Sequence, residues 1–444
     1  MYKEREAITE PNGTERLPKR CSIDILSQQE TACTEAKWFL WKEREVRVAF
    51  LAFLCAGVAL AGFVEYWSHT RRVLVIPIRV HVNGTRGKST TTRLIAAGLR
   101  AGGLRVVAKT TGTAARLILE DGSELPVRRR GRGRGNIAEQ MKTVALAAKR
   151  RADALVLECM ALEPENQWVS EHRMIRSTIG VITNVRDDHL DVMGPRLLDV
   201  ARALSLTIPR EGCLVTAENA FLDVFMERAR ALGTSVHVAD ASEVPDEVNA
   251  AFSYVSFKEN VACALKVCEL AGVARDVAIS GMLSARGDPG AMRVLRIPRG
   301  SGDYVLVNAF AANDYTSTML IWRMIVEGSI LRDVGEGMPV AVVMNNRADR
   351  IPRIRELSRL VACEVRPRYV FLIGEAARIA EAELARSGMD LRRVVDVSSL
   401  DDPRSVLDKI ESQVPGGAVL FAVGNTKGMG QRLAEFFERD GETL

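Results

Sequence analysis

Short apolar segments alternate with amphipathic ones along most of this chain of 444 residues. The first series begins with an apolar segment at 73–82 and an amphipathic one at 88–101, and a second series begins near Tyr304. Apolar strands that alternate with amphipathic helices are typical of a parallel sheet covered by helices on both faces. The sequence therefore predicts an α/β protein with a central domain at 71–285 and a smaller, doubly wound domain at 286–444.

The alternation of apolar and amphipathic segments predicts the individual strands and helices. Strands are expected at 73–82, 104–108, 153–158, 178–183, 212–217, 304–308, 339–344, 368–373 and 417–423. Helices are expected at 88–101, 138–150, 197–206, 219–232, 258–271, 315–326, 353–361, 375–387, 402–412 and 429–438. The glycine- and proline-containing segment 286–294 is the expected linker between the two domains.

An apolar segment near the N-terminus, 48–64, holds seventeen residues without a charge. This is the lower limit for a membrane-spanning helix, and aromatic residues flank the segment: Trp38, Trp41, Tyr66 and Trp67. We therefore expect a transmembrane anchor at 48–67. A buried helix and a cleaved signal peptide are the less favoured interpretations, because the segment has no polar face and no small residues where cleavage would occur. Residues 1–47, with nine acidic and nine basic residues, are expected to form a weakly ordered extension.

The overall charge and the cysteines exclude some classes of protein. The chain has 61 Lys and Arg against 56 Asp and Glu, and a net charge of +5 is too small to indicate a nucleic-acid partner. Its eight cysteines are irregularly spaced and form no C-x-x-C pair, which favours buried reduced thiols over a zinc site or a disulfide framework. We therefore expect a reducing, cytosol-facing compartment and no nucleic acid.

The most specific motif is a G-T-R-G-K-S loop that lies between an expected strand and an expected helix. Its glycines allow backbone N–H groups to turn toward one centre, and the helix N-terminus adds a positive dipole, so phosphate oxygens bind there. Lys88 is expected to neutralise the β- and γ-phosphates of ATP and Ser89 to bind Mg²⁺. The loop is a shortened P-loop, because Val82 stands where the full pattern has glycine. The expected nucleotide-binding residues are Gly84, Thr85, Arg86, Gly87, Lys88, Ser89 and Thr90.

Acidic residues follow two other expected strands. Glu158 ends the strand at 153–158, so it is expected at the sheet edge that carries the phosphate loop, where it can reach the metal. A solvated loop is the alternative for this residue, and the roles of Glu163 and Glu165 stay open. The segment 187–191 contains Asp187, Asp188, His189 and Asp191, which are hard oxygen donors and one imidazole. His189 is a candidate ligand for a second Mg²⁺, although a structural histidine is the alternative.

One dense cluster of arginines is interleaved with glycines between the expected strand at 104–108 and the expected helix at 138–150. It consists of Arg128, Arg129, Arg130, Arg132 and Arg134. A solvated loop and a binding site for an anionic substrate are equally consistent with it. RNA binding is disfavoured, because no aromatic residues for base stacking are interleaved.

These motifs together resemble the Mur ligase superfamily, the ATP-dependent amide ligases that include folylpolyglutamate synthase. Within that superfamily the chain is most similar to the ligase subunits of bacterial poly-γ-glutamate synthases, which act in capsule biosynthesis. The resemblance covers about 70–440 and rests on VNGTRGKST, KTTGTAAR, NIAEQ, ECMALEPE, DHLDVMGP, DPGAMRV, NAFAANDYTST, NNRADR and VGNTKG, in that order. The general Mur motifs match at Gly84 to Ser89, at Glu158, and at Asn184 with Asp188, His189 and Asp191.

The resemblance implies an activity and its participants. ATP would phosphorylate the chain-end carboxylate of poly-γ-glutamate, and the amine of glutamate would attack the acyl phosphate. Two magnesium ions, catalytic roles for Lys88 and His189, and a closing Rossmann-like C-terminal domain are implied as well. So are a membrane-anchored protein with cytosolic catalytic domains and other membrane subunits as partners. Arg116 and the arginine cluster would then guide carboxylates.

The sequence departs from the general Mur pattern in two places. No lysine occurs between Arg150 and Phe257, so the usual carbamylated lysine cannot hold a second metal ion. The segment 308–314, NAFAAND, stands where Mur enzymes have D-Y-A-H-N-P, and Asn308 and Asn313 are the candidate nucleotide contacts there. The alternatives are another Mur or folylpolyglutamate-type ligase, a membrane-tethered P-loop phosphotransferase, or a non-catalytic nucleotide-binding subunit.

Overall fold

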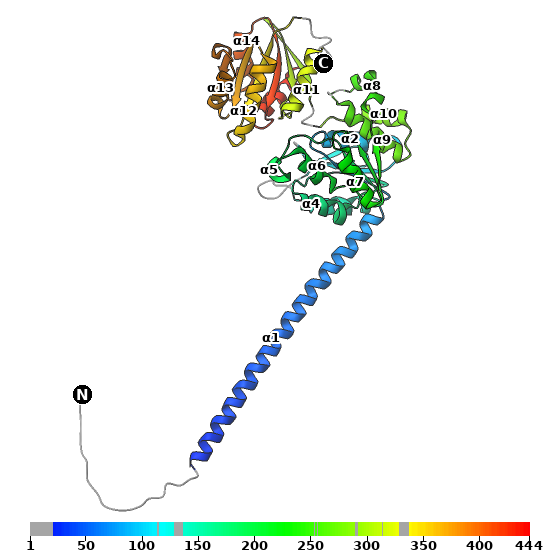
Figure 1. Ribbon diagram of the computed structural model, residues 1–444, viewed down its shortest axis with the longest axis vertical. Helices are drawn as coiled ribbons and strands as arrows, with labels where there is room; N and C mark the ends of the chain where they lie inside the picture. The colour runs from blue at the N-terminus through cyan, green and yellow to red at the C-terminus, as the bar shows by residue number, and fades with distance from the viewer. Residues whose placement is uncertain are drawn as a thin grey trace, which may run out of the picture. The chain divides into compact units, whose positions relative to one another are not determined.

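The computed structural model describes residues 21–112, 115–127, 136–252, 254, 256–288, 292–312, 314–327 and 337–444. The chain divides into two compact units, Met1–Ser68 and His69–Leu444 (Figure 1). The second unit contains both sheets and all of the motifs described above.

Helix α1 (Cys21–Leu74) is a single continuous helix, drawn in blue in Figure 1. Its segment Glu45–Leu74 is long and apolar enough to cross a membrane, with a mean hydropathy of 2.2 in its most apolar window. The expectation of a weakly ordered extension differs from the structure at residues 21–47, which are helical. No glycine or proline occurs from residue 21 to residue 56, so nothing in this segment interrupts a helix.

The expected strand at 73–82 begins too early, because α1 ends at Leu74 and the strand starts at Ile78. Pro77 explains the boundary, since the residue before a proline is disfavoured in the α conformation. Val73 and Ile76 are nevertheless fully buried, and they pack with Leu155 and Leu157 under the first sheet.

The first sheet has eight strands in the order β4-β3-β2-β5-β1-β6-β7-β8. From β2 to β8 in this order the strands are parallel, whereas β3 and β4 form an antiparallel edge. The strands are β1 (Ile78–Asn83), β2 (Val106–Thr110), β3 (Arg116–Ile118), β4 (Glu124–Pro126), β5 (Ala154–Glu158), β6 (Ile179–Ile182), β7 (Cys213–Thr216) and β8 (Ser235–Val238). The carboxyl ends of β5, β1 and β6 therefore lie side by side at the centre of the sheet.

Helices cover both faces of this sheet. On one face Val80 and Val156 pack with α2 (Lys88–Ala101), α9 (Lys258–Leu270) and α10 (Arg275–Leu283). The other face is covered by α3 (Glu139–Lys149), α6 (Leu197–Ser205), α7 (Leu222–Leu232) and the π-helical turn η1 (Ser170–Ile175). The shorter elements are α4 (Pro164–Val169), α5 (Leu190–Met193), η2 (Ala241–Glu243) and α8 (Asp246–Ala250).

The second sheet has seven strands in the order β13-β12-β11-β14-β10-β9-β15. The strands from β13 to β10 in this order are parallel, and β9 and β15 form an antiparallel edge. The strands are β9 (Val294–Arg299), β10 (Gly302–Asn308), β11 (Val340–Asn346), β12 (Tyr369–Gly374), β13 (Val394–Asp396), β14 (Ala418–Gly424) and β15 (Glu442–Thr443).

The C-terminal domain is doubly wound, as expected. One face of its sheet packs with α11 (Tyr315–Val326), α12 (Ile351–Leu360) and α13 (Ala377–Arg386). The other face packs with α14 (Pro403–Gln413) and α15 (Met429–Asp440). The remaining turns are η3 (Ala348–Arg350), η4 (Val361–Val365) and η5 (Leu391–Arg393). Both sheets are mixed at one edge, a feature that the alternation of elements does not predict.

A buried ion pair connects strand β1 to the π-helical turn η1. His81 is fully buried, and its Nδ1 lies 2.8 Å from Oε2 of Glu171 in η1. Glu171 also accepts hydrogen bonds from the backbone N–H and the hydroxyl of Ser177, at 2.8 and 2.9 Å. Burial opposes protonation of the imidazole, but the neighbouring Cys159 and Glu171 outweigh it and raise the pKa of His81 to about 10. The pair therefore fixes η1 beneath the strand that leads into the phosphate loop.

We predict that this pair makes stability depend on pH. Because folding raises the pKa of His81 from 6.5 to about 10, its contribution is complete below pH 6.5 and is lost as the pH rises toward 10. Urea denaturation should show that the free energy of unfolding falls by more than about 1 kcal/mol over this window. A double variant with neutral groups, His81→Asn with Glu171→Gln, should lack this part of the pH dependence. An identical pH profile for both proteins would contradict the assignment.

Candidate active site

The phosphate loop joins β1 to α2 and requires its two glycines. Gly84 has a φ of +128°, and a Cβ there would lie 2.1 Å from Oγ1 of Thr183. Gly87 has a φ of +79° and is the N-cap of α2. Lys88 donates from Nζ to the carbonyl oxygens of Gly84 and Thr85, at 2.7 and 3.3 Å. The lysine thus lies over the loop, where its charge can meet a phosphate.

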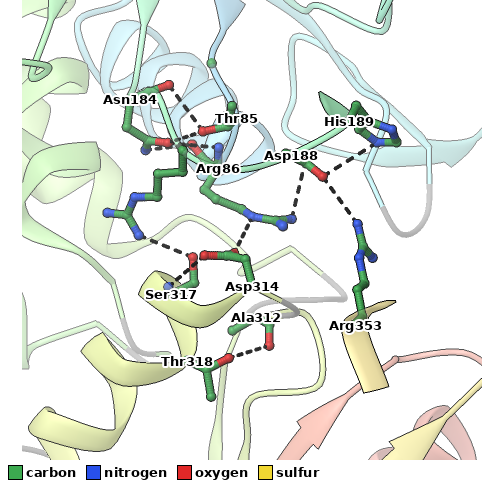
Figure 2. Close-up of polar contacts among 12 residues, drawn as sticks. Thr85, Arg86, Asn184, Asp188, His189, Ala312, Asp314, Ser317, Thr318 and Arg353 are labelled. Atoms are coloured by element: carbon green, nitrogen blue, oxygen red, sulfur yellow. Dashed lines mark hydrogen bonds and ion pairs between the residues drawn. The ribbon is translucent and has the colours of Figure 1, made fainter. Parts of the chain in front are cut away.

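Asn184, two residues after β6, holds the loop in this shape (Figure 2). Its Oδ1 accepts from the Thr85 hydroxyl at 2.7 Å and from the Arg86 N–H at 3.1 Å. Its Nδ2 donates to the Arg86 carbonyl oxygen at 3.1 Å, and its own carbonyl oxygen accepts from the Thr85 N–H at 3.1 Å. Thr183 adds a hydrogen bond from its hydroxyl to the same Arg86 carbonyl, at 2.6 Å. The resemblance in sequence pointed to Asn184, and the structure shows that it acts on the loop.

Ser89 and Glu158 meet at the carboxyl edge of the sheet, as the sequence predicts. The Ser89 hydroxyl lies 2.8 Å from Oε2 of Glu158, which is buried. The Thr111 N–H donates to the same oxygen at 2.6 Å, and Gln140 donates to the Glu158 carbonyl at 2.9 Å. A hydroxyl beside a carboxylate supplies the hard oxygen donors that Mg²⁺ prefers, so these residues fit a magnesium ion held together with phosphate oxygens and water.

His189 precedes α5 in a left-handed conformation, with a φ of 49°. Its Nε2 lies 3.8 Å from Oδ1 of Asp188. Burial lowers the pKa of His189, Asp188 opposes this effect, and the cations Arg353 and Lys88 add to it. A neutral imidazole is therefore favoured. Within the described residues, no group of three His, Cys, Asp or Glu side chains is placed to hold a metal ion.

Contacts between the two domains lie beside the phosphate loop, and no local pattern in the sequence predicts them (Figure 2). Arg86 donates from Nε to Oδ2 of Asp314 at 2.9 Å, and its Nη1 lies 3.7 Å from Oδ2 of Asp188. Arg353, on α12, lies with Nη2 3.4 Å from Oδ1 of Asp188. These residues lie far apart in the sequence, so only the folded chain brings them together.

A cavity of about 280 Å³ extends from the phosphate loop to the C-terminal domain. Of the predicted nucleotide-binding residues, Arg86, Gly87, Thr90 and Asn308 line it. The lining also includes residues that the sequence did not suggest, among them Glu218, Phe257, Asn260, Ala312, Ser317 and Ile321. Its walls are thus part polar and part apolar, as a nucleoside would require.

The predicted substrate residues are less well defined. Arg116 is the first residue of β3, at the antiparallel edge of the first sheet. Arg128, Arg129, Arg130, Arg132 and Arg134 lie outside the described residues, as does Asn313. Glu163 and Glu165 lie at the start of α4, where Glu163 accepts from Asn166 at 2.8 Å. The hydrogen bond of Glu163 with Asn166 is therefore a local contact at the start of α4.

Gly112 provides a test of the Ser89–Glu158 site. A Cβ at this position would lie 2.5 Å from the Ser89 hydroxyl, so we predict that Gly112→Ala pushes the hydroxyl away from Glu158. The affinity for Mn²⁺ in the presence of ATP, measured by electron paramagnetic resonance, should fall about 10-fold or more. Gly300→Ala is the matched control, because a Cβ there meets no atom within 4 Å. Equal affinities in the two variants would show that Ser89 is not a ligand.

Solved structures of folylpolyglutamate synthases share this fold. The Yersinia pestis bifunctional folylpolyglutamate synthase/dihydrofolate synthase, solved with AMPPNP and a manganese ion, matches with a TM-score of 0.59 and 17% identity over 84% of this chain and 92% of that one. The Thermotoga maritima folylpolyglutamate synthase matches with a TM-score of 0.56 and 14% identity over 86% and 97%. At such low identity these matches show the fold alone.

Comparisons of sequence are more specific. The Mur ligase middle domain matches residues 82–269, and the poly-gamma-glutamate synthase CapB C-terminal domain matches residues 294–440. The capsule biosynthesis protein CapB of Bacillus anthracis is 41% identical over 333 residues, which are 74% of this chain and 70% of the relative. The PGA synthase CapB of Bacillus subtilis (strain 168) is 36% identical over 388 residues, 87% of this chain and 96% of the relative. The chain therefore belongs to the CapB family of poly-γ-glutamate synthases, a branch of the Mur ligases.

Proposed function

We propose that this chain is an ATP-dependent ligase that forms the γ-glutamyl bonds of poly-γ-glutamate. Its family membership supports this activity. The observation that carries the proposal is the convergence of three features at one sheet edge: the phosphate loop with Lys88, the Ser89–Glu158 pair, and the cavity that extends from the loop to the C-terminal domain.

The reaction needs an activated carboxylate, because a carboxylate ion is a poor electrophile. A carboxylate oxygen at the chain end attacks the γ-phosphorus of ATP, the bond to the β-phosphate oxygen breaks, and ADP leaves. The amine of glutamate then attacks the acyl phosphate, phosphate leaves with the bonding electron pair, and the nitrogen loses a proton. Lys88 would bind the β- and γ-phosphate oxygens and spread the charge that moves between them.

Ser89 and Glu158 would hold the magnesium ion, and that ion supplies Lewis-acid stabilisation of the phosphate charge when bound. The hydrogen bond from the Thr111 N–H keeps the Glu158 carboxylate turned toward Ser89. Because this carboxylate is buried, it loses little orientational freedom when it meets a cation.

The cavity is the proposed nucleoside site. Thr90 and Asn308 contribute polar groups to it, and Asn260 and Glu218 add an amide and a carboxylate. Ile321 and Phe257 supply apolar surface suited to a purine ring. Because Asn308 belongs to the C-terminal domain, nucleotide binding would hold the two domains together and keep water from the acyl phosphate.

The remaining predicted residues keep proposed roles. Arg116 and the cluster from Arg128 to Arg134 would attract the polyanionic product chain, which carries one carboxylate per residue. The resemblance alone supports His189 as a ligand of a second magnesium ion, whereas the guanidinium groups of Arg86 and Arg353 beside Asp188 disfavour a cation there. Glutamate and the growing chain are the proposed substrates, with no part for nucleic acid.

Membrane attachment would follow from α1. The segment Glu45–Leu74 is long and apolar enough to serve as an anchor. Because ATP is a cytosolic substrate, the unit His69–Leu444 would lie in the cytosol. Other membrane subunits of the synthase are the proposed partners.

The first test is the removal of the phosphate-loop charge. Lys88→Ala should lower glutamate-dependent ATP turnover about 100-fold or more, because it removes the ammonium group that binds the β- and γ-phosphate oxygens in the proposed complex. The melting temperature should stay unchanged, since the hydrogen bonds of Lys88 within the described residues go to two carbonyl oxygens of the loop. Lys409→Ala, at an exposed position on α14, is the control and should be fully active. Wild-type turnover in Lys88→Ala would refute the phosphate-loop assignment.

Topology is tested with tags at both ends of the chain. In right-side-out vesicles we expect a protease added outside to leave a C-terminal tag intact and to digest an N-terminal one. The protein should also stay in the membrane pellet after an alkaline wash. Digestion of the C-terminal tag from outside would place the catalytic unit on the wrong side for ATP.

A further inference from the structure

Asp188 is surrounded by cations from both domains (Figure 2). Its Oδ2 lies 3.7 Å from Nη1 of Arg86, and its Oδ1 lies 3.4 Å from Nη2 of Arg353. Lys88 and Arg353 also face the imidazole of His189, which lies 3.8 Å from Asp188. The carboxylate that a second metal ion would use is therefore already occupied by two guanidinium groups.

This arrangement does not fit a second divalent cation. Each unit of positive charge near the site raises the energy of a further cation, and three such side chains are within reach of Asp188 and His189. Within the described residues, no group of three His, Cys, Asp or Glu side chains is placed to hold a metal ion, although Asp191 also acts on His189. The chain also has no lysine between residues 150 and 257 from which a carbamate ligand could form.

Arg353 is placed to serve an anion. It is the third residue of α12, where the helix dipole is positive, and its side chain is one-quarter exposed, so it can move. Burial lowers the pKa of Arg353, and the nearby cations Arg350 and Arg86 add to this effect while Asp188 opposes it. Arg353, Arg350 and Arg86 thus lie near one another, with Asp188 and Asp314 as counter-charges, and a phosphate group could take the place of Asp188 as the partner of Arg353.

We propose, on the basis of the function proposed above, that the guanidinium of Arg353 takes the place of a second metal ion. When ATP is bound, it leaves Asp188 and binds the oxygens of the phosphoryl group in transfer. Arg353 would then be a catalytic residue supplied by the C-terminal domain, and it neither gains nor loses a proton in the step. The γ-phosphorus exchanges its bond to the β-phosphate oxygen for a bond to the carboxylate oxygen.

A charge supplied in this way couples chemistry to domain closure. Arg353 contributes to the site only while the C-terminal domain contacts the central domain, as it does through Arg86 and Asp314. An open enzyme would then transfer phosphate to water slowly, because the stabilising charge is absent from the site. Arginines supplied by another domain accelerate phosphoryl transfer by about 10³- to 10⁵-fold in comparable sites.

The number of metal ions bound per chain tests the inference without measuring catalytic activity. The whole chain is titrated with Mn²⁺ in the presence of a non-hydrolysable ATP analogue, and bound Mn²⁺ is counted by electron paramagnetic resonance. We expect one Mn²⁺ per chain, lost in Glu158→Gln and retained in His189→Ala. Two Mn²⁺ per chain, or loss of Mn²⁺ in His189→Ala, would overturn the proposal.

Kinetics of Arg353 variants provide the second test. Arg353→Ala should lower kcat about 1,000-fold and change the Kd of the ATP analogue less than about 3-fold, with partial rescue in Arg353→Lys. Arg359→Ala, at an exposed position on the same helix, is the control. An unchanged kcat in a folded Arg353→Ala would overturn the proposal. If the wild-type protein forms no γ-glutamyl product, the proposed function is wrong. The Mn²⁺ count still shows whether one or two metal ions bind beside the phosphates of ATP, and so it tests the inference independently.

Discussion

The side-chain amide of Asn184 binds two consecutive residues of the phosphate loop, and much of the site depends on that contact. Through Thr85 and Arg86 it fixes the backbone between Gly84 and Gly87. The start of α2 is thereby fixed as well, which brings Ser89 within 2.8 Å of Glu158. Since Asn184 follows β6 and Glu158 ends β5, the parallel order β5-β1-β6 is what brings these groups to one edge.

The long parallel strands could be predicted because burial on both faces makes them continuously apolar. Strands β3, β13 and β15 have two or three residues, and most of their side chains are not fully buried, so neither length nor periodicity marks them. The extent of α1 was missed for another reason. Its charged N-terminal part lacks an apolar stripe, and only the absence of glycine and proline from residue 21 to residue 56 favours a helix there.

Within the candidate site, two residues could be predicted from local sequence. Ser89 ends the phosphate-loop motif, and Glu158 is a carboxylate at the end of an apolar strand. Gly112 and Arg353 could not be predicted in this way. Gly112 matters because a Cβ there would lie 2.5 Å from the Ser89 hydroxyl, an approach that depends on the pairing of β2 with β5. Arg353 reaches Asp188 from another domain, 165 residues further along the chain, and no local pattern encodes that distance.

The ion pair between Arg86 and Asp314 joins the two domains, and each residue has a second partner within its own domain. Asp314 is the N-cap of α11, where it accepts from the Ser317 N–H at 2.8 Å, and it accepts from Arg86 at 2.9 Å. If Arg86 withdraws, the carboxylate keeps its hydrogen bond and the favourable field of the helix N-terminus. Arg86 in turn keeps Asp188 on its own domain. Separation of the domains therefore leaves both carboxylates with a partner, because Asp314 keeps the Ser317 N–H and Asp188 keeps Arg86.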